Sequence, residues 1–328
     1  MISGTDGIVK LSIIIVNYNV KYFLRQLLHS LYSSTTTFDF EVIVVDNAST
    51  DGSTDFIKKE FPQLELLINS HNEGFSKANN LGIGKSKGEY VLLLNPDTIL
   101  QEDTLELCVD YMESHGDAGA LGCRMIDGSG HYLPESKRGF PSPRVALFKS
   151  LGLSALFPKS GYFNAYYLGD LDEFKINEVD VLTGAFMLIR RKAIDACGLL
   201  DEDFFMYGED IDLSYRIKKE GYKIIYFPLT TIIHFKGEST KKQTVAYVKR
   251  FYGAMQIFAN KHYQGQRAFW LRLILQVGII LRAGLAIIGQ LLSRFGPPGI
   301  EWIAIASALI SFAYFWAYLY YHDASYYD

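Results

Sequence analysis

Residues 11–19, with the sequence LSIIIVNYN, decide the fold, because a short and nearly continuous apolar run ends there in asparagine. EVIVV at residues 41–45 and YVLLL at residues 90–94 have the same form, and each is followed by Asp or Asn. Apolar runs of this length indicate parallel strands that are buried on both faces.

Segments with the apolar spacing of helices separate these runs, at residues 22–31, 53–59 and 74–84. This alternation predicts an α/β fold with a Rossmann-like first half. Ligands of such sheets bind at the carboxyl ends of the strands, so we expect the functional site there. The polar residues at these ends are Asn17, Asn19, Asp46, Asn47, Asn95 and Asp97.

The second half of the chain is expected to complete one mixed sheet. Residues 117–180 mix Gly, Pro and aromatic residues, and only a hairpin turn at 127–130 is predicted there. The later elements are a regular segment at 181–190, a helix at about 213–220, a strand at 223–227 and a last strand ending at Ile233 and His234.

The composition excludes some classes of function. Lys and Arg total 32 against 36 Asp and Glu, so the net charge of −4 provides no basic field and we expect no nucleic-acid partner. Cys108, Cys123 and Cys197 have no metal-binding spacing and predict buried free thiols in a reducing compartment. No cleavage site follows the first apolar run, so no export signal is expected.

The composition becomes strongly apolar from residue 268 onward. Residues 302–321 contain no charged residue, and about 20 apolar residues span a bilayer. We therefore expect a first domain at 1–265, followed at 266–328 by a C-terminal hydrophobic helical hairpin that associates with the membrane, with helices at about 268–293 and 300–322. The alternatives are a hairpin buried against the first domain and an oligomer interface.

Basic residues cluster before and at the start of the first of these helices, which places the first domain in the cytoplasm by the positive-inside rule. A first helix that lies on the membrane surface is equally compatible with the pattern. The cluster consists of Lys249, Arg250, Lys261, Arg267 and Arg272.

Taken singly, the polar motifs are also compatible with structural roles. Asn-Pro-Asp at 95–97 is typical of a turn, and Asp46 is suited to helix capping. Glu209 and Asp210 at a helix start interact favourably with the helix dipole. His234 on an apolar strand is typical of a core histidine.

In combination and in this order, the motifs resemble the family 2 nucleotide-sugar glycosyltransferases with the GT-A fold, and among them the rhamnosyltransferase-like bacterial enzymes of surface-polysaccharide assembly. The resemblance covers about residues 11–240. It rests on SIIIVNYN at 12–19, VIVVDNASTDGS at 42–53, NEGFSKANNLGI at 72–83, LLLNPDT at 92–98, LTGAFMLIRR at 182–191, FFMYGEDIDLSYRIKKEGY at 204–222 and HFKGES at 234–239.

The resemblance implies a divalent cation, Mn²⁺ or Mg²⁺, that bridges the diphosphate of a nucleotide-sugar donor. Asp97 takes the place of the last acid of the family's DxD motif, and His234 the place of a further metal ligand, which slightly favours manganese. The first acid of the motif is Asn95 here. This departure removes one negative charge and leaves Asn95 as a weaker partner on the donor side.

Further donor contacts are implied for Asp46, which would accept hydrogen bonds from the base or ribose, and for Asn72 and Asn79, which would line the donor cleft.

On the acceptor side, the resemblance makes Asp210 the base that takes the proton of the attacking hydroxyl. Glu209 would either bind the acceptor sugar or hold Asp210 in place. Thr183 and Gly184 belong to a segment beneath the sugar and the acceptor. We expect Asp212 to pair with Arg216 four residues later, and not to act in catalysis.

These roles predict transfer of a sugar, with inversion, from a dTDP-, UDP- or GDP-linked donor to a saccharide or polyprenyl-linked saccharide in cell-surface polysaccharide biosynthesis. The enzyme would act at the cytoplasmic face of a bacterial inner membrane. A dinucleotide oxidoreductase is excluded, because no GxGxxG follows the first strand. An inactive membrane scaffold that kept the GT-A fold remains an alternative; Asn95 favours it, whereas Asp97, Asp210 and His234 oppose it.

Overall fold

The computed structural model describes residues 9–150, 152–235 and 245–263, with isolated positions among residues 265–312. The chain separates into two compact units, Met1–Leu275 and Gln276–Asp328, and the fold below is that of the first unit.

The predicted C-terminal helices at about 268–293 and 300–322 lie outside the described residues, apart from a few isolated positions. The helical hairpin and the domain boundary at residue 265 therefore stay predictions. Within the ranges that the structure does describe, no helix is both long enough and apolar enough to cross a membrane.

Four parallel strands form the first half of the sheet, in the order β3-β2-β1-β4. The three predicted strands are β1 (Leu11–Asn17), β2 (Phe40–Asp46) and β4 (Tyr90–Leu94), and β3 (Glu65–Ile68) adds an edge that the sequence did not indicate. The predicted helices are confirmed as α1 (Lys21–Tyr32), α2 (Ser53–Glu60) and α3 (Phe75–Lys85). This order places the topological switch point between β1 and β4, whose carboxyl ends are adjacent.

The second half continues the same sheet, so the prediction of a single mixed sheet is confirmed. The strand β8 (Phe186–Arg190) runs antiparallel to β4 and pairs with β6 (Ala118–Ile126) on its other side. Beyond β6 follow β9 (Lys223–His234) and β5 (Thr98–Ile99), and β7 (Asn177–Glu178) also pairs with β9.

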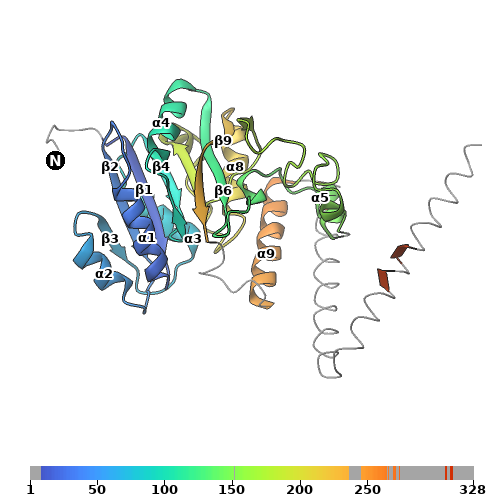
Figure 1. The fold of residues 1–328 in the computed structure, drawn as a ribbon. Helices are drawn as coiled ribbons and strands as arrows, with labels where there is room; N and C mark the ends of the chain where they lie inside the picture. The colour runs from blue at the N-terminus through green and yellow to red at the C-terminus, as the bar shows by residue number, and fades with distance from the viewer. Residues whose placement is uncertain are drawn as a thin grey trace, which may run out of the picture. The chain divides into compact units, whose positions relative to one another are not determined.

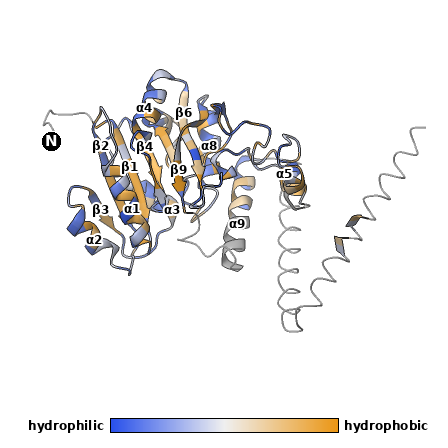
Figure 2. Cartoon of the chain, in the orientation of Figure 1, coloured by the Kyte–Doolittle hydropathy of each residue, from blue (hydrophilic) through white to orange (hydrophobic). Residues whose placement is uncertain are grey.

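Helices cover both faces of this sheet (Figure 1). One hydrophobic core lies between the sheet and α1, α2 and α4 (Thr104–Ser114). The other lies under α3, α7 (Arg191–Cys197) and α8 (Glu209–Lys219). Because both faces are covered, the central strands are apolar along their length, as Figure 2 shows in orange. A third cluster packs α9 (Val245–His262) against Phe204 and Ile211.

Two elements differ from the sequence prediction. Helix α8 begins at Glu209 and not near residue 213. Gly208 adopts a left-handed conformation (φ 86°) directly before it, and Asp210 and Asp212 in the first turn stabilise the positive end of the helix dipole. The strand β9 is continuous, where two strands were expected. Cys123 pairs with Phe227 but Arg124 with Thr231, so the intervening residues form a bulge within β9.

The segment between β6 and β8 contains little regular structure. The predicted turn at 127–130 is confirmed, since Asp127 N donates to His131 O (2.8 Å) and Ile126 bridges Tyr132. After it come the 3₁₀ turn η1 (Pro134–Ser136) and the short helices α5 (Pro143–Ser150) and α6 (Leu153–Leu156).

Candidate active site

The carboxyl ends of β1 and β2 hold a buried polar cluster around Asp46. Asn17 Nδ2 donates to Asp46 Oδ2 (2.7 Å), and the backbone N of Ser49 donates to Asp46 Oδ1 (2.8 Å). Asp46 and Asn17 are fully buried. Asp46 therefore lies at the predicted edge of the sheet, where its carboxylate fixes the backbone of the following loop.

The predicted donor residues Asn72 and Asn79 hold the backbone around the start of α3. Asn72 Oδ1 accepts from Gly74 N (2.9 Å), and the buried Asn79 donates through Nδ2 to Phe75 O (2.9 Å). Gly74 has φ 86°, and a Cβ at that position would lie 2.5 Å from Phe205 O. Only glycine fits this position.

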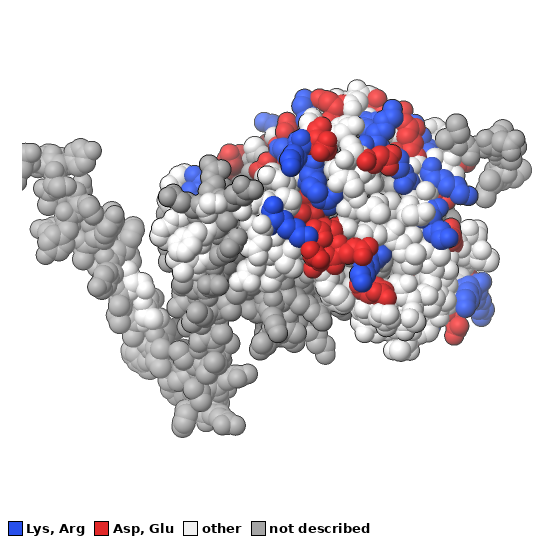
Figure 3. All heavy atoms as spheres, turned by 180° about the vertical axis from the view of Figure 1, so that it is seen from behind, with Lys and Arg blue, Asp and Glu red and all other residues white. Residues whose placement is uncertain are grey.

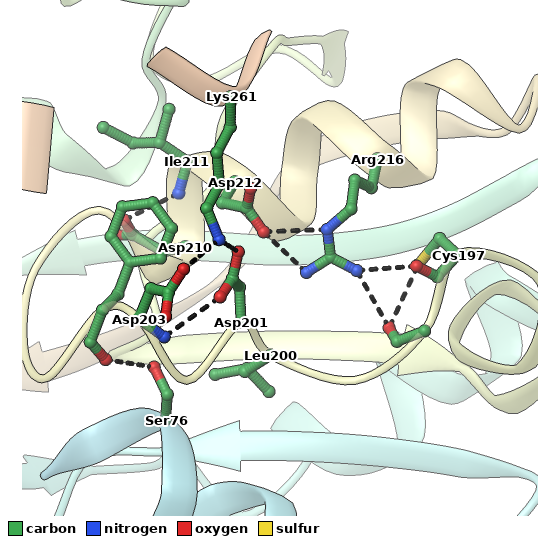
Figure 4. Close-up of polar contacts among 12 residues, drawn as sticks. Ser76, Cys197, Leu200, Asp201, Asp203, Asp210, Ile211, Asp212, Arg216 and Lys261 are labelled. Atoms are coloured by element: carbon green, nitrogen blue, oxygen red, sulfur yellow. Dashed lines mark hydrogen bonds and ion pairs between the residues drawn. The ribbon is translucent and has the colours of Figure 1, made fainter. Parts of the chain in front are cut away.

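The loop before α8 packs directly on this start of α3. Phe75 N donates to Phe205 O (2.7 Å), and Ser76 Oγ donates to Phe204 O (2.7 Å). Figure 4 shows Ser76 on one side of this loop and Asp210 on the other. The predicted donor side and the predicted acceptor side are thus in contact.

The structure brings the two predicted metal ligands together. Thr98 pairs with His234 between β5 and β9, so Asp97 lies beside the histidine, with 3.3 Å between Asp97 Oδ1 and His234 Nε2. Both side chains are buried, yet Asp97 Oδ1 and His234 Nδ1 have no hydrogen-bond partner among the described residues. Buried polar atoms are normally paired, so two unused ones at this edge of the sheet indicate a ligand.

Asn95 does not contribute a carboxylate to this pair, and its own backbone is engaged. Asn95 N donates to Ala185 O (3.0 Å), and Asn95 O accepts from Thr98 Oγ1 (2.8 Å). In the described part of the chain, no group of three or more His, Cys, Asp or Glu side chains is arranged to hold a metal ion. Asp97 and His234 are of the kinds that bind a divalent cation, and a cation held by this pair would need further ligands from outside the protein side chains described.

Asp210 lies in the first turn of α8 and is held by two donors. Its Oδ1 accepts from Ile211 N (2.8 Å), and its Oδ2 forms an ion pair with Arg138 Nη2 (2.5 Å). The carboxylate is mostly buried, with a side-chain exposure of 12%. It is therefore fixed in direction while part of it stays accessible.

Glu209, the neighbour of Asp210, has a different environment. Burial, and then the negative charge of Asp210, raise the pKa of Glu209 to about 8. Its Oε2 has no hydrogen-bond partner among the described residues. Glu209 is therefore protonated at neutral pH, so of the two neighbouring carboxyl groups Asp210 is the better proton acceptor.

Asp212 is not part of this site, and its predicted pairing with Arg216 is confirmed. Arg216 Nε and Nη2 lie 2.8 and 2.7 Å from Asp212 Oδ2, as Figure 4 shows. His262 Nε2 of α9 contacts Asp212 Oδ1 (2.6 Å), and Lys261 of α9 forms ion pairs with Asp201 and Asp203. His262 thus fastens α9 to α8, and Lys261 fastens it to the loop before α8. On the face shown in Figure 3, acidic and basic side chains are interspersed.

The predicted acceptor segment at Thr183 and Gly184 joins the two clusters. At one end, Leu182 O accepts from Arg138 Nη2 (2.7 Å), the same atom that contacts Asp210. At the other end, Ala185 O accepts from Asn95 N. A Cβ on Gly184 would lie 3.3 Å from the ring of Phe75, so this segment passes close to the start of α3.

Comparison with known proteins assigns the chain. Residues 12–198 match Glycosyl transferase family 2, which is more than half of the chain. The chain belongs to this family. It is accordingly a glycosyltransferase, and its sequence is similar to the rhamnosyltransferase-like members.

Two curated relatives of this family 2 glycosyltransferase are rhamnosyltransferases. The N-acetylglucosaminyl-diphospho-decaprenol L-rhamnosyltransferase of Mycobacterium tuberculosis is 28% identical, over 84% of this chain and 92% of the relative. The rhamnosyltransferase WbbL of Escherichia coli is also 28% identical, over 68% and 82%. The fold is similar to that of a mannosyltransferase from Pyrobaculum calidifontis in complex with GDP-Man and Mn²⁺ (TM-score 0.53, 19% identity, 92% of this chain and 80% of that one).

Sequence reasoning missed Arg138, which contacts the predicted base Asp210. Arg138 is buried, and its only sequence signal is a Lys-Arg pair inside a stretch of Gly, Pro and aromatic residues. Such a pair is usually exposed, and nothing in the local pattern indicates a carboxylate partner 72 positions later in the chain.

Proposed function

We propose that this family 2 glycosyltransferase transfers a deoxysugar, with inversion, from a dTDP-linked donor to a polyprenyl-linked saccharide in cell-surface polysaccharide biosynthesis. The observation that carries the proposal is the segment Leu182–Ala185, which is bonded at one end to the group that holds Asp210 and at the other end to Asn95, two residues from Asp97. A base and a pair of metal ligands at the two ends of one short segment suit a displacement between an acceptor and a diphosphate.

Asp97 and His234 would hold the divalent cation, Mn²⁺ or Mg²⁺. When bound, such an ion neutralises the charge that develops on a departing nucleoside diphosphate. Asn95 would lie beside the donor without adding charge, and Asp46, Asn72 and Asn79 would shape the pocket for the nucleotide by holding the backbone around it.

Asp210 would act as the base in a single displacement. An acceptor hydroxyl attacks the anomeric carbon on the face opposite the phosphate, its proton passes to Asp210, and the bond from the anomeric carbon to the phosphate oxygen breaks with its electron pair leaving on the diphosphate. One displacement inverts the anomeric configuration. Glu209, protonated at neutral pH, would donate a hydrogen bond to the acceptor, and Thr183 and Gly184 would lie beneath it.

The names of the relatives support the choice of substrates. The mycobacterial relative is a rhamnosyltransferase named for an N-acetylglucosaminyl-diphospho-decaprenol acceptor, and its similarity extends over 84% of this chain. Because the similarity is not confined to the donor half, a deoxysugar donor and a lipid-linked acceptor are proposed together.

A surface near α5 and α6 supports a site of action at the membrane. Residues 141–169 contain three basic residues and no Asp or Glu, in a chain whose net charge is negative. Leu156 (71% exposed), Phe157 and Tyr162 are exposed there. Apolar side chains among basic ones match an anionic lipid surface, which supports the proposed site of action at a bacterial membrane; its cytoplasmic face remains part of the proposal.

The test is an assay of the full chain with dTDP-L-rhamnose, N-acetylglucosaminyl-diphospho-polyprenol and Mn²⁺, with UDP- and GDP-sugars as alternative donors. Transfer with inverted configuration, lost on chelation of the metal, would support the proposal. A product with retained configuration would refute the single displacement. Absence of both transfer and metal-dependent donor binding with every donor would favour the inactive scaffold.

A further inference from the structure

We propose that Arg138 is a positioning residue for the sugar transfer, because one of its nitrogen atoms holds both the base Asp210 and the acceptor segment at Leu182. The inference rests on the proposed function, since it concerns the proton transfer at Asp210.

Backbone hydrogen bonds to Val181 and Asp180 fix the main chain at Arg138. Arg138 N donates to Val181 O (3.1 Å) and Val181 N donates to Arg138 O (2.9 Å), which forms an antiparallel bridge beside the acceptor segment. Asp180 N also donates to Arg138 O (3.2 Å). The side chain that carries the guanidinium group is therefore attached to a rigid part of the backbone.

The side chain then spans from this bridge to α8. Its Nη2 lies 2.7 Å from Leu182 O and 2.5 Å from Asp210 Oδ2, and its Nη1 lies 3.4 Å from the hydroxyl of Tyr166. A planar guanidinium group keeps these directions fixed, whereas a lysine ammonium is a point charge on a flexible chain. Movement of Arg138 would move the base relative to the acceptor segment.

The ion pair keeps Arg138 charged although the group is buried. Burial has the largest single influence and lowers the pKa of Arg138, but the charge of Asp210, together with Tyr166 and the hydrogen bonds to both, raises that pKa above its ordinary value. Arg138 is the basic group that contacts Asp210, and protonated Glu209 lies beside it. Asp212 on the same helix is engaged with Arg216 and His262, and Lys261 of α9 with Asp201 and Asp203.

The contact has one expected effect on the reaction. The hydrogen bonds from Arg138 Nη2 to Asp210 and to Leu182 O set where the acceptor hydroxyl meets the base. A displacement of about 1 Å in such a geometry can cost on the order of a hundredfold in rate.

The test compares the full-length wild type with Arg138→Met and Arg138→Lys in the transfer assay with dTDP-L-rhamnose and N-acetylglucosaminyl-diphospho-polyprenol. For Arg138→Met we expect kcat to fall roughly ten- to a hundredfold, with the KM for dTDP-L-rhamnose within about twofold. Arg138→Lys should restore part of this loss and lower kcat by about tenfold, because it keeps a positive charge beside Asp210 and loses the planar guanidinium group.

Arg190→Met is the matched control. Arg190 donates to the backbone carbonyls of Met112 (2.5 Å) and Ala118 (3.0 Å) and to the hydroxyl of Tyr90 (2.9 Å), none of which belongs to the candidate site. We expect Arg190→Met to lower the melting temperature while kcat changes less than in Arg138→Met. Circular dichroism and thermal unfolding of each variant show whether it is folded. If Arg138→Met does not fold, Arg138→Lys decides through its kcat.

The outcomes separate the two proposals. A wild type that transfers no sugar would refute the proposed function. A wild type that transfers sugar, beside a folded Arg138→Met with unchanged kcat, would refute the role of Arg138 alone. A fall in kcat that is equal in the Met and Lys variants, with the KM for dTDP-L-rhamnose raised in both, would assign Arg138 to structure only.

Discussion

Replacement of Asp210 by asparagine separates the chemistry of the base from its structural role. The side chain is 12% exposed and bonded to Arg138, so the choice of replacement matters. Alanine would leave Arg138 without its carboxylate, which costs about 3–5 kcal/mol for a buried pair. Asparagine keeps one oxygen that accepts from Arg138, but its amide nitrogen cannot accept from Ile211 N. One hydrogen bond is therefore lost and the other loses its charged acceptor, which together costs about 2–3 kcal/mol. We therefore expect Asp210→Asn to remain folded.

Its effect on the rate should be much larger than its effect on stability. Loss of a positioned base usually lowers the rate by about 10²–10⁴-fold, while Asp46, Asp97 and His234 on the donor side are unchanged. The assay measures transfer from dTDP-L-rhamnose, and calorimetry measures donor affinity in the presence of Mn²⁺. Near-normal transfer by a folded Asp210→Asn, or a loss of donor affinity that accounts for the lower rate, would refute the assignment of the base.

Further predictions concern the metal pair, the buried acid and the apolar surface. Asp97→Ala should abolish Mn²⁺-dependent donor binding in calorimetry. His234→Ala should weaken this binding less, because water can fill the coordination position that the histidine leaves. An unchanged Mn²⁺-dependent affinity for the donor would show that the replaced residue is not a metal ligand. The pKa of Glu209 is raised from 4.5 to about 8 in the folded protein, so between these values the folded state binds more protons than the unfolded state and stability falls as pH rises. Glu209→Gln should flatten the decline of the melting temperature over this pH range, and an identical decline in both proteins would contradict the shift. Changing Leu156 and Phe157 to serine should weaken binding to anionic vesicles at least about tenfold, because apolar burial is lost. Tyr22→Ser, which alters an exposed residue of α1, is the control. Equal binding by all variants would contradict the proposal that the surface near α5 and α6 contacts the membrane.

The donor half of the molecule was predictable because its contacts are local. Asp46 accepts from Ser49 three residues later, Asn72 from Gly74 two residues later, and Asn79 donates to Phe75 four residues earlier. Such contacts leave recognisable motifs at the ends of apolar runs, and those runs predicted β1, β2 and β4. The edge strand β3 was missed because it is only four residues long and partly exposed.

The acceptor half was only partly predictable, because distant residues hold it. Asp210 and Asp97 were found through motifs, but Arg138 contacts Leu182 over 44 positions and Asp210 over 72. The fastening of α8 by His262, 50 positions after Asp212, is likewise absent from any local pattern. A pattern within a few residues shows which face of an element is apolar, but not which remote charge will be buried against it.

Backbone contacts hold the two halves of the site to each other. The loop that Asn72 and Gly74 shape, on the donor side, is bonded through Phe75 to Phe205, and Phe205 lies four residues before Glu209. Because Gly74 has no side chain, Phe205 O can approach it closely. The loop before α3 and the loop before α8 are thus joined by contacts of 2.7 Å, so a change that displaces one loop also displaces the other.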